Sequence, residues 1–393
     1  MLCRRNGIVL VLLAITLFLL RHTVYDYCHG MLSQHSSTSP RGALGLNYNE
    51  RLIWIDHGEI RRIGTHWIRG FIDMHQIDSS HLEQDRNIKA LLGAVDAGFK
   101  TILSLKWNYA DRDFPIAGSP ELAAELQVLD RLLQAVMGRV DILVIGNEPF
   151  IEAKPEQAGE QLCVFYETLA KTIFDFRNVH RGDAAMSTRL YMGALNRLDL
   201  PDKRTPAIER MLGFIASRPE LDGVDLHPHM STFAGHKSMV DYTVGRVRPD
   251  QSFLATEFSM IWHWKKHMGD VASAHFRMRY GLPDDTKVYQ VINSALKQPM
   301  PFEQWQDFLS HEPWYMEYSH FISDAVQLYR STGRLAVATY PYCPMRERKM
   351  PLQETEAPWL LNGVYAPSTV QREPGAARHE NFPWAGEFRR MLQ

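Results

Sequence analysis

Cysteine is scarce in this chain of 393 residues, which has four: Cys3, Cys28, Cys163 and Cys343. So few cysteines cannot supply the disulfide framework of a small secreted scaffold. Asn-x-Ser/Thr glycosylation sites are missing altogether. Their absence favours a bacterial periplasmic or surface setting over a eukaryotic secretory one.

An excess of one charge is also missing. The chain has 43 Lys and Arg against 45 Asp and Glu, a formal net charge of −2, and no long run of one sign. Nucleic-acid-binding proteins usually carry a basic patch or arm, so no nucleic-acid partner is expected. Hydrophobic residues make up 45% of the chain and charged residues 22%, which is an ordinary globular composition with ample material for a large core.

One uniformly apolar run stands at the beginning. Arg4 and Arg5 precede Ile8–Leu20, which only Thr16 interrupts, and a basic start before such a run is typical of a secretory signal. Because no small-x-small cleavage site follows, we expect residues 1–22 to be an uncleaved signal anchor, with a cleaved signal as the alternative. By the positive-inside rule the two arginines stay in the cytoplasm and the rest of the chain lies outside it.

The remaining chain divides into a linker and one domain. Residues 23–42 are the linker, in which residues 31–42 are polar and rich in serine, as flexible linkers are. In residues 43–393, short apolar runs alternate with longer amphipathic stretches, a rhythm typical of βα units. The runs predict strands at Ala43–Tyr48, His66–Ile72, Lys100–Lys106, Val140–Ile145, Leu190–Leu195, Gly223–Leu226, Phe253–Phe258 and Leu335–Tyr340.

Helical spacing of apolar residues fills most of the intervals between these strands. It predicts helices at Leu82–Ala97, Pro120–Val136, Gln157–Phe176, Ala207–Ser217, Lys237–Val247, Met316–Thr332 and Glu387–Leu392. Eight strands with about as many helices favour a (β/α)8 TIM barrel.

Two long segments depart from a minimal barrel. Ser259–Pro313 follows the seventh strand and Cys343–Arg378 follows the eighth. Both therefore belong on the C-terminal face, where barrel enzymes place their active sites. Loops of this length are usually functional or disordered.

The strongest chemical signal is a pair of glutamates at strand ends. Gly-Asn-Glu-Pro at residues 146–149 closes the fourth strand, and Ala-Thr-Glu-Phe at residues 255–258 closes the seventh. These strands lie across the barrel mouth from each other, so Glu148 and Glu257 can flank one bond. Glycosidic cleavage needs such a pair, with one carboxyl group protonated and the other ionised.

These motifs resemble those of the clan A glycoside hydrolases, a superfamily of retaining enzymes on the (β/α)8 barrel. The resemblance implies that Glu148 is the general acid/base and Glu257 the nucleophile. It also implies that Asn147 contacts the sugar hydroxyl next to the anomeric carbon, and that Arg69, at the end of the second strand, supports the nucleophile.

The match to the clan is incomplete at two strand ends. The clan often has His-x-Tyr after the sixth strand, whereas this chain has His-Pro-His, so His227 matches and His229 replaces the tyrosine. In the clan, a tryptophan after the eighth strand often forms the floor of the sugar-binding site. Here Tyr340 or Tyr342 can substitute, or Trp359 can reach in from the loop.

Aromatic residues near the predicted mouth are candidates for stacking on sugar rings. Trp262 and Trp264 lie nearest to Glu257 in the sequence, and Trp107 closes the third strand. Aromatic rings suit the C–H-rich face of a sugar. The alternative is that several of these rings only pin the long loop onto the barrel.

A metal site is the competing interpretation of His227 and His229, because an H-x-H pair can chelate an ion. Asp225 lies close by, and His66 and His75 lie on another strand. They do not make up the ligand set that barrel metallohydrolases usually need. We therefore expect no metal and no cofactor, and a metal-dependent hydrolase remains an alternative.

Together these features predict a retaining hydrolase of a β-linked polysaccharide or oligosaccharide, with no nucleic-acid partner and a membrane anchor. Residues 358–363 also resemble the post-strand-eight loop of polysaccharide-active clan members. An anchored extracytoplasmic enzyme of this kind resembles bacterial exopolysaccharide-processing members of the clan. The alternative is a glycan-binding pseudoenzyme on the same barrel.

Overall fold

The computed structural model describes residues 42–392 except 79, 181–182, 344–350 and 374. The anchor predicted for residues 1–22 and all of the predicted linker but Gly42 lie outside the described residues. None of the helices in the described part is both long and apolar enough to cross a membrane.

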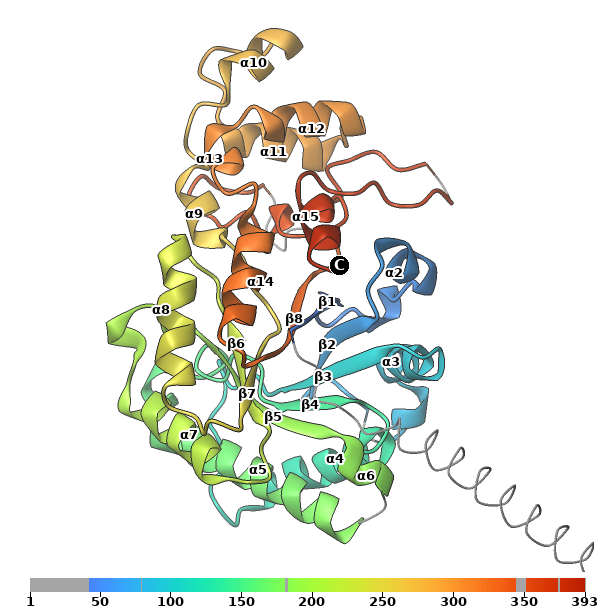
Figure 1. Cartoon of the computed structure of the whole chain (residues 1–393), viewed down its shortest axis with the longest axis vertical. Coiled ribbons are helices and arrows are strands. Elements are labelled where there is room, and N and C mark those ends of the chain that lie inside the picture. The colour runs from blue at the N-terminus through green and yellow to red at the C-terminus, as the bar shows by residue number, and fades with distance from the viewer. Residues whose placement is uncertain (1–41, 79, 181–182, 344–350, 374, 393) are drawn as a thin grey trace, which may run out of the picture. The chain divides into compact units, whose positions relative to one another are not determined.

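Eight parallel strands form a closed barrel in which each strand pairs with the next and β8 pairs with β1 (Figure 1). All eight predicted strands are present, with ends that differ by a few residues. They are buried on both faces, which explains their near-continuous apolar sequences. The strands are β1 (Ala43–Asn47), β2 (Trp67–Asp73), β3 (Lys100–Lys106), β4 (Ile142–Ile145), β5 (Arg189–Asn196), β6 (Gly223–His227), β7 (Ser252–Ala255) and β8 (Leu335–Pro341).

Helices connect the strands along the outside of the barrel (Figure 1). Ser119 caps the helix that begins at Pro120 by accepting a hydrogen bond from the Leu122 amide, as expected for serine followed by proline. The short helix α2 was not predicted. The helices between strands are α2 (His57–Ile63), α3 (Arg86–Asp96), α4 (Pro120–Val136), α5 (Glu160–Val179), α6 (Asp183–Ser187), α7 (Pro206–Ser217), α8 (Phe233–Val244) and α14 (Phe321–Ser331).

The long segment after β7 is helical. Its apolar residues bury against one another; Phe276, Trp305 and Phe308 are almost fully buried, so the segment has a small core of its own. Figure 1 shows α10 to α13 grouped together beyond one end of the barrel. The helices are α9 (Ile261–Lys266), α10 (Ala274–Tyr280), α11 (Val288–Lys297), α12 (Phe302–Ser310) and α13 (Pro313–Met316).

The segment after β8 ends in the last helix, α15 (Trp384–Arg390). Trp384 of this helix is fully buried and packs against Trp264 and Phe321. The short 3-10 helices are η1 (Leu52–Trp54), η2 (Leu82–Gln84), η3 (Pro155–Gln157), η4 (Pro201–Lys203) and η5 (Trp359–Leu361).

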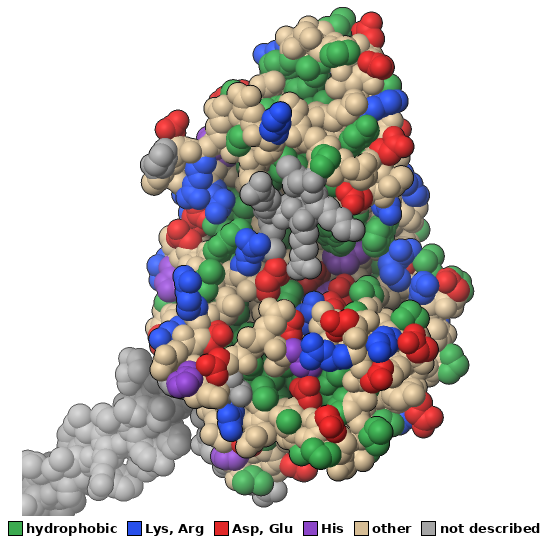
Figure 2. Space-filling model, turned by 180° about the vertical axis from the view of Figure 1, so that it is seen from behind, with side chains coloured by type: hydrophobic (Ala, Val, Ile, Leu, Met, Phe, Trp, Pro, Cys, Tyr) green, Lys and Arg blue, Asp and Glu red, His purple; other side chains and the backbone are tan. Residues whose placement is uncertain are grey.

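The surface is electrostatically mixed. On the face seen in Figure 2, basic and acidic side chains are interspersed and do not gather into a large patch of one sign. This distribution agrees with the balanced composition and offers no basic surface for a nucleic acid on that face.

Candidate active site

The predicted carboxylates meet at the C-terminal end of the barrel. Glu148 lies just after β4 and Glu257 just after β7. Both line one cavity of about 590 Å³, together with Asn147 and His229. The structure therefore brings the two sequence motifs into one site.

Arg69 holds one side of this site. It is fully buried, and its Nη1 donates a hydrogen bond to Glu257 Oε1 at 2.6 Å. Its Nη2 donates to Asn147 Oδ1 at 2.5 Å and to Ser104 Oγ at 3.1 Å. The planar guanidinium group thus fixes the positions of Asn147 and Glu257 relative to each other.

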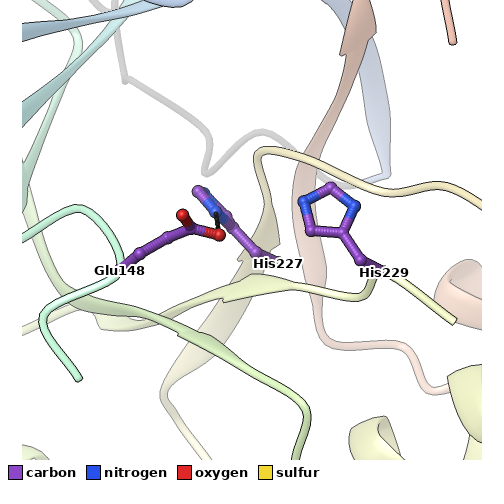
Figure 3. A group of neighbouring side chains, drawn as sticks. All are labelled: Glu148, His227 and His229. Atoms are coloured by element: carbon purple, nitrogen blue, oxygen red, sulfur yellow. Dashed lines mark hydrogen bonds and ion pairs between the residues drawn. The ribbon is translucent and has the colours of Figure 1, made fainter. Parts of the chain in front are cut away.

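His227 lies between the two carboxylates and is also fully buried. Its Nδ1 lies 3.1 Å from Glu148 Oε1, a contact that Figure 3 shows, and its Nε2 lies 3.0 Å from Thr256 Oγ1. The same Nε2 is 3.9 Å from Glu257 Oε1. Arg69 and His227 therefore contact the carboxylates, and neither of them lines the cavity.

His229 occupies the place where the clan often has tyrosine. Its Nε2 lies 3.6 Å from Glu257 Oε2, and its Nδ1 is hydrogen-bonded to Ser259 Oγ at 2.8 Å. His229 therefore contacts the second oxygen of Glu257, opposite the one that Arg69 holds.

The environment of Glu257 favours its ionised form. Burial alone would raise the pKa of this carboxyl group. The positive charges of His227 and Arg69 and the hydrogen bond from His229 outweigh burial and hold the pKa of Glu257 well below its usual range. A carboxylate that stays ionised suits nucleophilic attack.

Glu148 has a different environment. Burial and the charge of Glu257 raise the pKa of Glu148, but the hydrogen bond and charge of His227 outweigh them, so this pKa lies below its usual value. Arg69 has no contact with Glu148 comparable to its 2.6 Å hydrogen bond to Glu257. The two carboxyl groups therefore differ in how strongly they are kept ionised, as acid/base and nucleophile pairs do.

The backbone at Glu148 is in the left-handed region, with φ of 53°. This conformation is uncommon for residues other than glycine and often occurs at functional sites. The Asn196 amide, from the end of β5, donates to Glu148 Oε1 at 3.2 Å. Sequence reasoning missed Asn196; its only signal was a polar residue ending an apolar strand.

Three of the predicted sugar contacts are wrong. Trp107, Trp264 and Tyr340 are each fully buried and lie outside the lining of the cavity. Trp107 donates through Nε1 to Glu125 Oε2 on α4 at 3.0 Å. Its side chain is directed toward the helices around the barrel, so it cannot stack on a ligand.

The other two misassigned rings belong to the packing around α14. Trp264 packs against Phe321 and Trp384, and Tyr340 packs against Phe258 and Phe321. Neighbouring residues on a strand point to opposite faces. Thr339, next to Tyr340, donates a hydrogen bond to the Thr256 carbonyl, so Tyr340 points to the other face.

Trp262, Trp359 and Tyr342 do line the cavity. Trp262 and Trp359 meet edge to face, with ring centroids 6.3 Å apart. The Trp262 Nε1 is buried and has no hydrogen-bond partner among the described residues. Tyr342 and Trp359 are two of the three residues expected to replace the tryptophan that the clan often has after the eighth strand.

The histidines do not form a convincing metal site. Ligand atoms of Glu148, His227 and His229 lie within 4.8 Å of one another. However, both ring nitrogens of His227 are already hydrogen-bonded, and the Arg69 cation lies 3.5 Å from its Nε2. A metal ion on these ligands would have to break the hydrogen bonds that His227 already makes.

Asp225 and His75, two of the other residues considered as ligands, have hydrogen-bond partners of their own. Asp225 accepts a hydrogen bond from Thr256 Oγ1 at 2.6 Å, and His75 lies 2.9 Å from Glu125. A separate group, half-buried Asp307 with exposed His275 and His311, also has ligand atoms within 4.8 Å of one another. His275 lies on α10, Asp307 on α12 and His311 directly after α12, and Arg279 already pairs with the aspartate at 3.0 Å.

No protein-family model and no curated protein matches the chain. Among solved structures, two fungal β-1,4-galactanases are represented by a chain with a TM-score of 0.50 and 12% identity, over 88% of this chain and 99% of that one. The GH53 catalytic domain of Ignisphaera aggregans has a TM-score of 0.48 and 14% identity, over 90% and 96%. The β-glycosidase of Thermosphaera aggregans has a TM-score of 0.48 and 8% identity, over 87% and 84%. The likeness to the galactanases shows a shared fold, a (β/α)8 barrel.

Proposed function

We propose that this protein is a retaining glycoside hydrolase that cleaves a β-linked polysaccharide or oligosaccharide. The observation that carries the proposal is that Glu148 and Glu257 line one cavity and are held in unlike electrostatic environments. Two carboxyl groups with unequal proton affinity are what glycosidic cleavage requires.

In the first step, the Glu257 carboxylate attacks the anomeric carbon while Glu148 gives its proton to the departing glycosidic oxygen. A covalent glycosyl-enzyme intermediate forms on Glu257. In the second step, Glu148 takes a proton from water, the water oxygen attacks the anomeric carbon, and Glu257 is released. Retaining enzymes keep the two carboxyl groups about 5–5.5 Å apart, and the shared contact with the His227 ring supports a close pair.

The remaining cavity residues support binding of a sugar chain. The Asn147 amide, oriented by Arg69, is available for the hydroxyl next to the anomeric carbon. Trp262, Trp359 and Tyr342 offer ring faces and edges to pyranose rings. A β-linked substrate is proposed from the resemblance to the clan and agrees with the galactanases that share the fold.

The test is a screen of β-linked polysaccharides, bacterial exopolysaccharides first, followed by a comparison of variants. Glu257→Gln is expected to abolish turnover while calorimetric glycan binding survives. The matched control is Glu156→Gln, on an exposed glutamate, which should keep wild-type turnover. Wild-type turnover in Glu257→Gln contradicts the catalytic assignment. Glycan binding by the wild type without product after long incubation would instead indicate a glycan-binding pseudoenzyme.

We also propose, from the sequence pattern alone, that residues 1–22 anchor the enzyme with its barrel outside the cytoplasmic membrane, at a bacterial periplasm or surface. There it would process an exopolysaccharide. Fractionation of cells expressing the full chain should place it in the membrane fraction. A chain lacking residues 1–22 should not be found there, and equal distribution of the two would contradict the proposal.

A further inference from the structure

We infer that His227 is a positioning residue that holds a proton in its hydrogen bond with Glu148. Asp225 orients the Thr256 hydroxyl, and Thr256 in turn requires a hydrogen on His227 Nε2, so the proton shared with Glu148 lies at His227 Nδ1. The inference rests on the proposed function for its consequence in catalysis. The hydrogen-bond chain itself can be tested without any substrate.

The chain starts at Asp225, which is fully buried on β6. Its carboxylate accepts hydrogen bonds from Thr256 Oγ1 at 2.6 Å and from the Thr256 amide at 3.3 Å. Burial raises the pKa of Asp225 above its ordinary value, although the charges of His227 and Arg69 and the two hydrogen bonds from Thr256 act to lower it. Both oxygens of Asp225 accept from Thr256, so the Thr256 hydroxyl proton points to Asp225 Oδ2.

The orientation of Thr256 then fixes the tautomer of His227. Because its own proton is used, Thr256 Oγ1 can only accept from His227 Nε2, which lies 3.0 Å away. His227 Nε2 therefore carries hydrogen. The tautomer with hydrogen on Nδ1 alone is excluded, since two lone pairs would then face each other in a buried site.

One proton must consequently lie between His227 Nδ1 and Glu148 Oε1, which are 3.1 Å apart. Either the ring is an imidazolium that donates to a carboxylate, or the ring is neutral and accepts from a carboxylic acid. The two forms differ by one proton transfer along this hydrogen bond. Both keep the proton that the general acid needs.

Charged groups around the pair decide on which side the proton lies. Glu257 Oε1 lies 3.9 Å from His227 Nε2, and Arg69 Nη2 lies 3.5 Å from the same nitrogen. The His229 ring lies beside the His227 ring, with centroids 5.9 Å apart. In the open site, burial lowers the pKa of His227, but Glu257, Glu148 and Asp225 raise it above its ordinary value. The proton therefore resides on His227 in the ligand-free site.

A bound sugar changes this balance by replacing water with a less polar group. A less polar environment favours the neutral pair over the ion pair, so the proton moves from His227 Nδ1 to Glu148 Oε1. Glu148 then gives it to the glycosidic oxygen, and the proton taken from water in the second step restores the shared state. No net proton is gained or lost over the cycle.

The experiment uses ¹⁵N NMR of the histidine rings in the ligand-free full-length protein, with His227→Gln to assign the signal. We expect a protonated Nε2 and a hydrogen-bonded proton at Nδ1. In Thr256→Val the acceptor for Nε2 is lost, so the ring should switch to a neutral form with hydrogen on Nδ1. Thr256→Ser keeps the hydroxyl and should restore the wild-type signals. An unprotonated Nε2 in the wild type, or unchanged ring signals in Thr256→Val, overturns the inference.

A second readout is the pH profile of kcat/KM on a β-linked oligosaccharide that the wild type hydrolyses, since its alkaline limb reports the acid of the free enzyme. Thr256→Val should shift the alkaline limb of the profile to lower pH by roughly one unit, and Thr256→Ser should leave it in place. A lower rate with an unmoved limb would indicate a purely structural role and overturn the inference. If the wild type hydrolyses no glycan, the proposed function fails while the NMR measurement still decides the proton arrangement.

Discussion

At the scale of single residues, Arg69 is the fixed positive charge of the site. It is fully buried and donates to Glu257 and Asn147 with different nitrogens of one planar group. Removing one partner of a buried ion pair leaves an uncompensated charge, which is costly. Glu257 is kept ionised by this arrangement together with His227.

Arg69→Lys is therefore expected to reduce activity although it keeps the charge. A lysine is a point charge that cannot bridge Glu257 and Asn147 as the guanidinium does. Losing one charge-assisted hydrogen bond of about 1.5–3 kcal/mol corresponds to roughly a 10- to 150-fold lower kcat. Steady-state kinetics on the substrate from the screen measure the change.

The control for this substitution is Arg139→Lys, because Arg139 pairs with Asp96 at the surface with exposed side chains on both sides. Surface pairs contribute little, so its kcat and melting temperature should stay near the wild type. Equal activity of Arg69→Lys and Arg139→Lys would mean that the contact of Arg69 with Glu257 does not matter for turnover.

At the scale of elements, the turn that leaves β4 decides where Glu148 points. Gly146 has φ of 111° and Glu148 has φ of 53°, so the chain turns sharply at the end of the strand. A Cβ at Gly146 would lie 2.9 Å from the Gly193 carbonyl oxygen and 3.3 Å from Tyr166. Only glycine fits both this conformation and this space.

Gly146→Ala is expected to destabilise the fold by roughly 2–5 kcal/mol, through a strained φ and a contact with neighbouring backbone. It should also lower kcat, because Glu148 is displaced. Urea unfolding and kinetics measure the two effects. Gly93→Ala is the matched control, since nothing lies within 4 Å of the added Cβ in α3. That change should be neutral or stabilise by up to about 1 kcal/mol; equal effects at both positions would refute the argument.

The sequence was sufficient to predict the eight strands and the two glutamate motifs, because strand ends in a (β/α)8 barrel all open onto one face. It was not sufficient for the aromatic residues. Trp264 lies only seven positions after Glu257 in the chain, yet it is buried against Phe321. Closeness in sequence does not tell which way a ring points once a loop folds into helices. Asn196 was missed for the same reason, since its contact with Glu148 depends on how two strand ends meet.

At the scale of the whole molecule, the outer helices are held together partly by a buried histidine. His236 of α8 is fully buried, its Nδ1 is hydrogen-bonded to the Tyr329 hydroxyl of α14 at 2.7 Å, and its Nε2 has no partner among the described residues. Burial, with a small contribution from His229, lowers the pKa of His236 to about 3. The fold therefore accommodates this side chain only in its neutral form.

Acid should consequently destabilise the whole barrel through His236. Its pKa is lower in the folded than in the unfolded chain, so the stability it contributes is present above pH 6.5 and is lost as pH falls toward 3. Each pH unit in this window lowers the free energy of unfolding by about 1.4 kcal/mol. His227, whose pKa is raised, acts in the opposite sense, so the comparison must be between variants. From pH 7.5 to 5, His236→Gln should lose about 2 kcal/mol less unfolding free energy than the wild type in urea titrations. His81→Gln, at an exposed side chain, should lose as much as the wild type; a His236→Gln curve parallel to both would show that His236 is protonated in the fold.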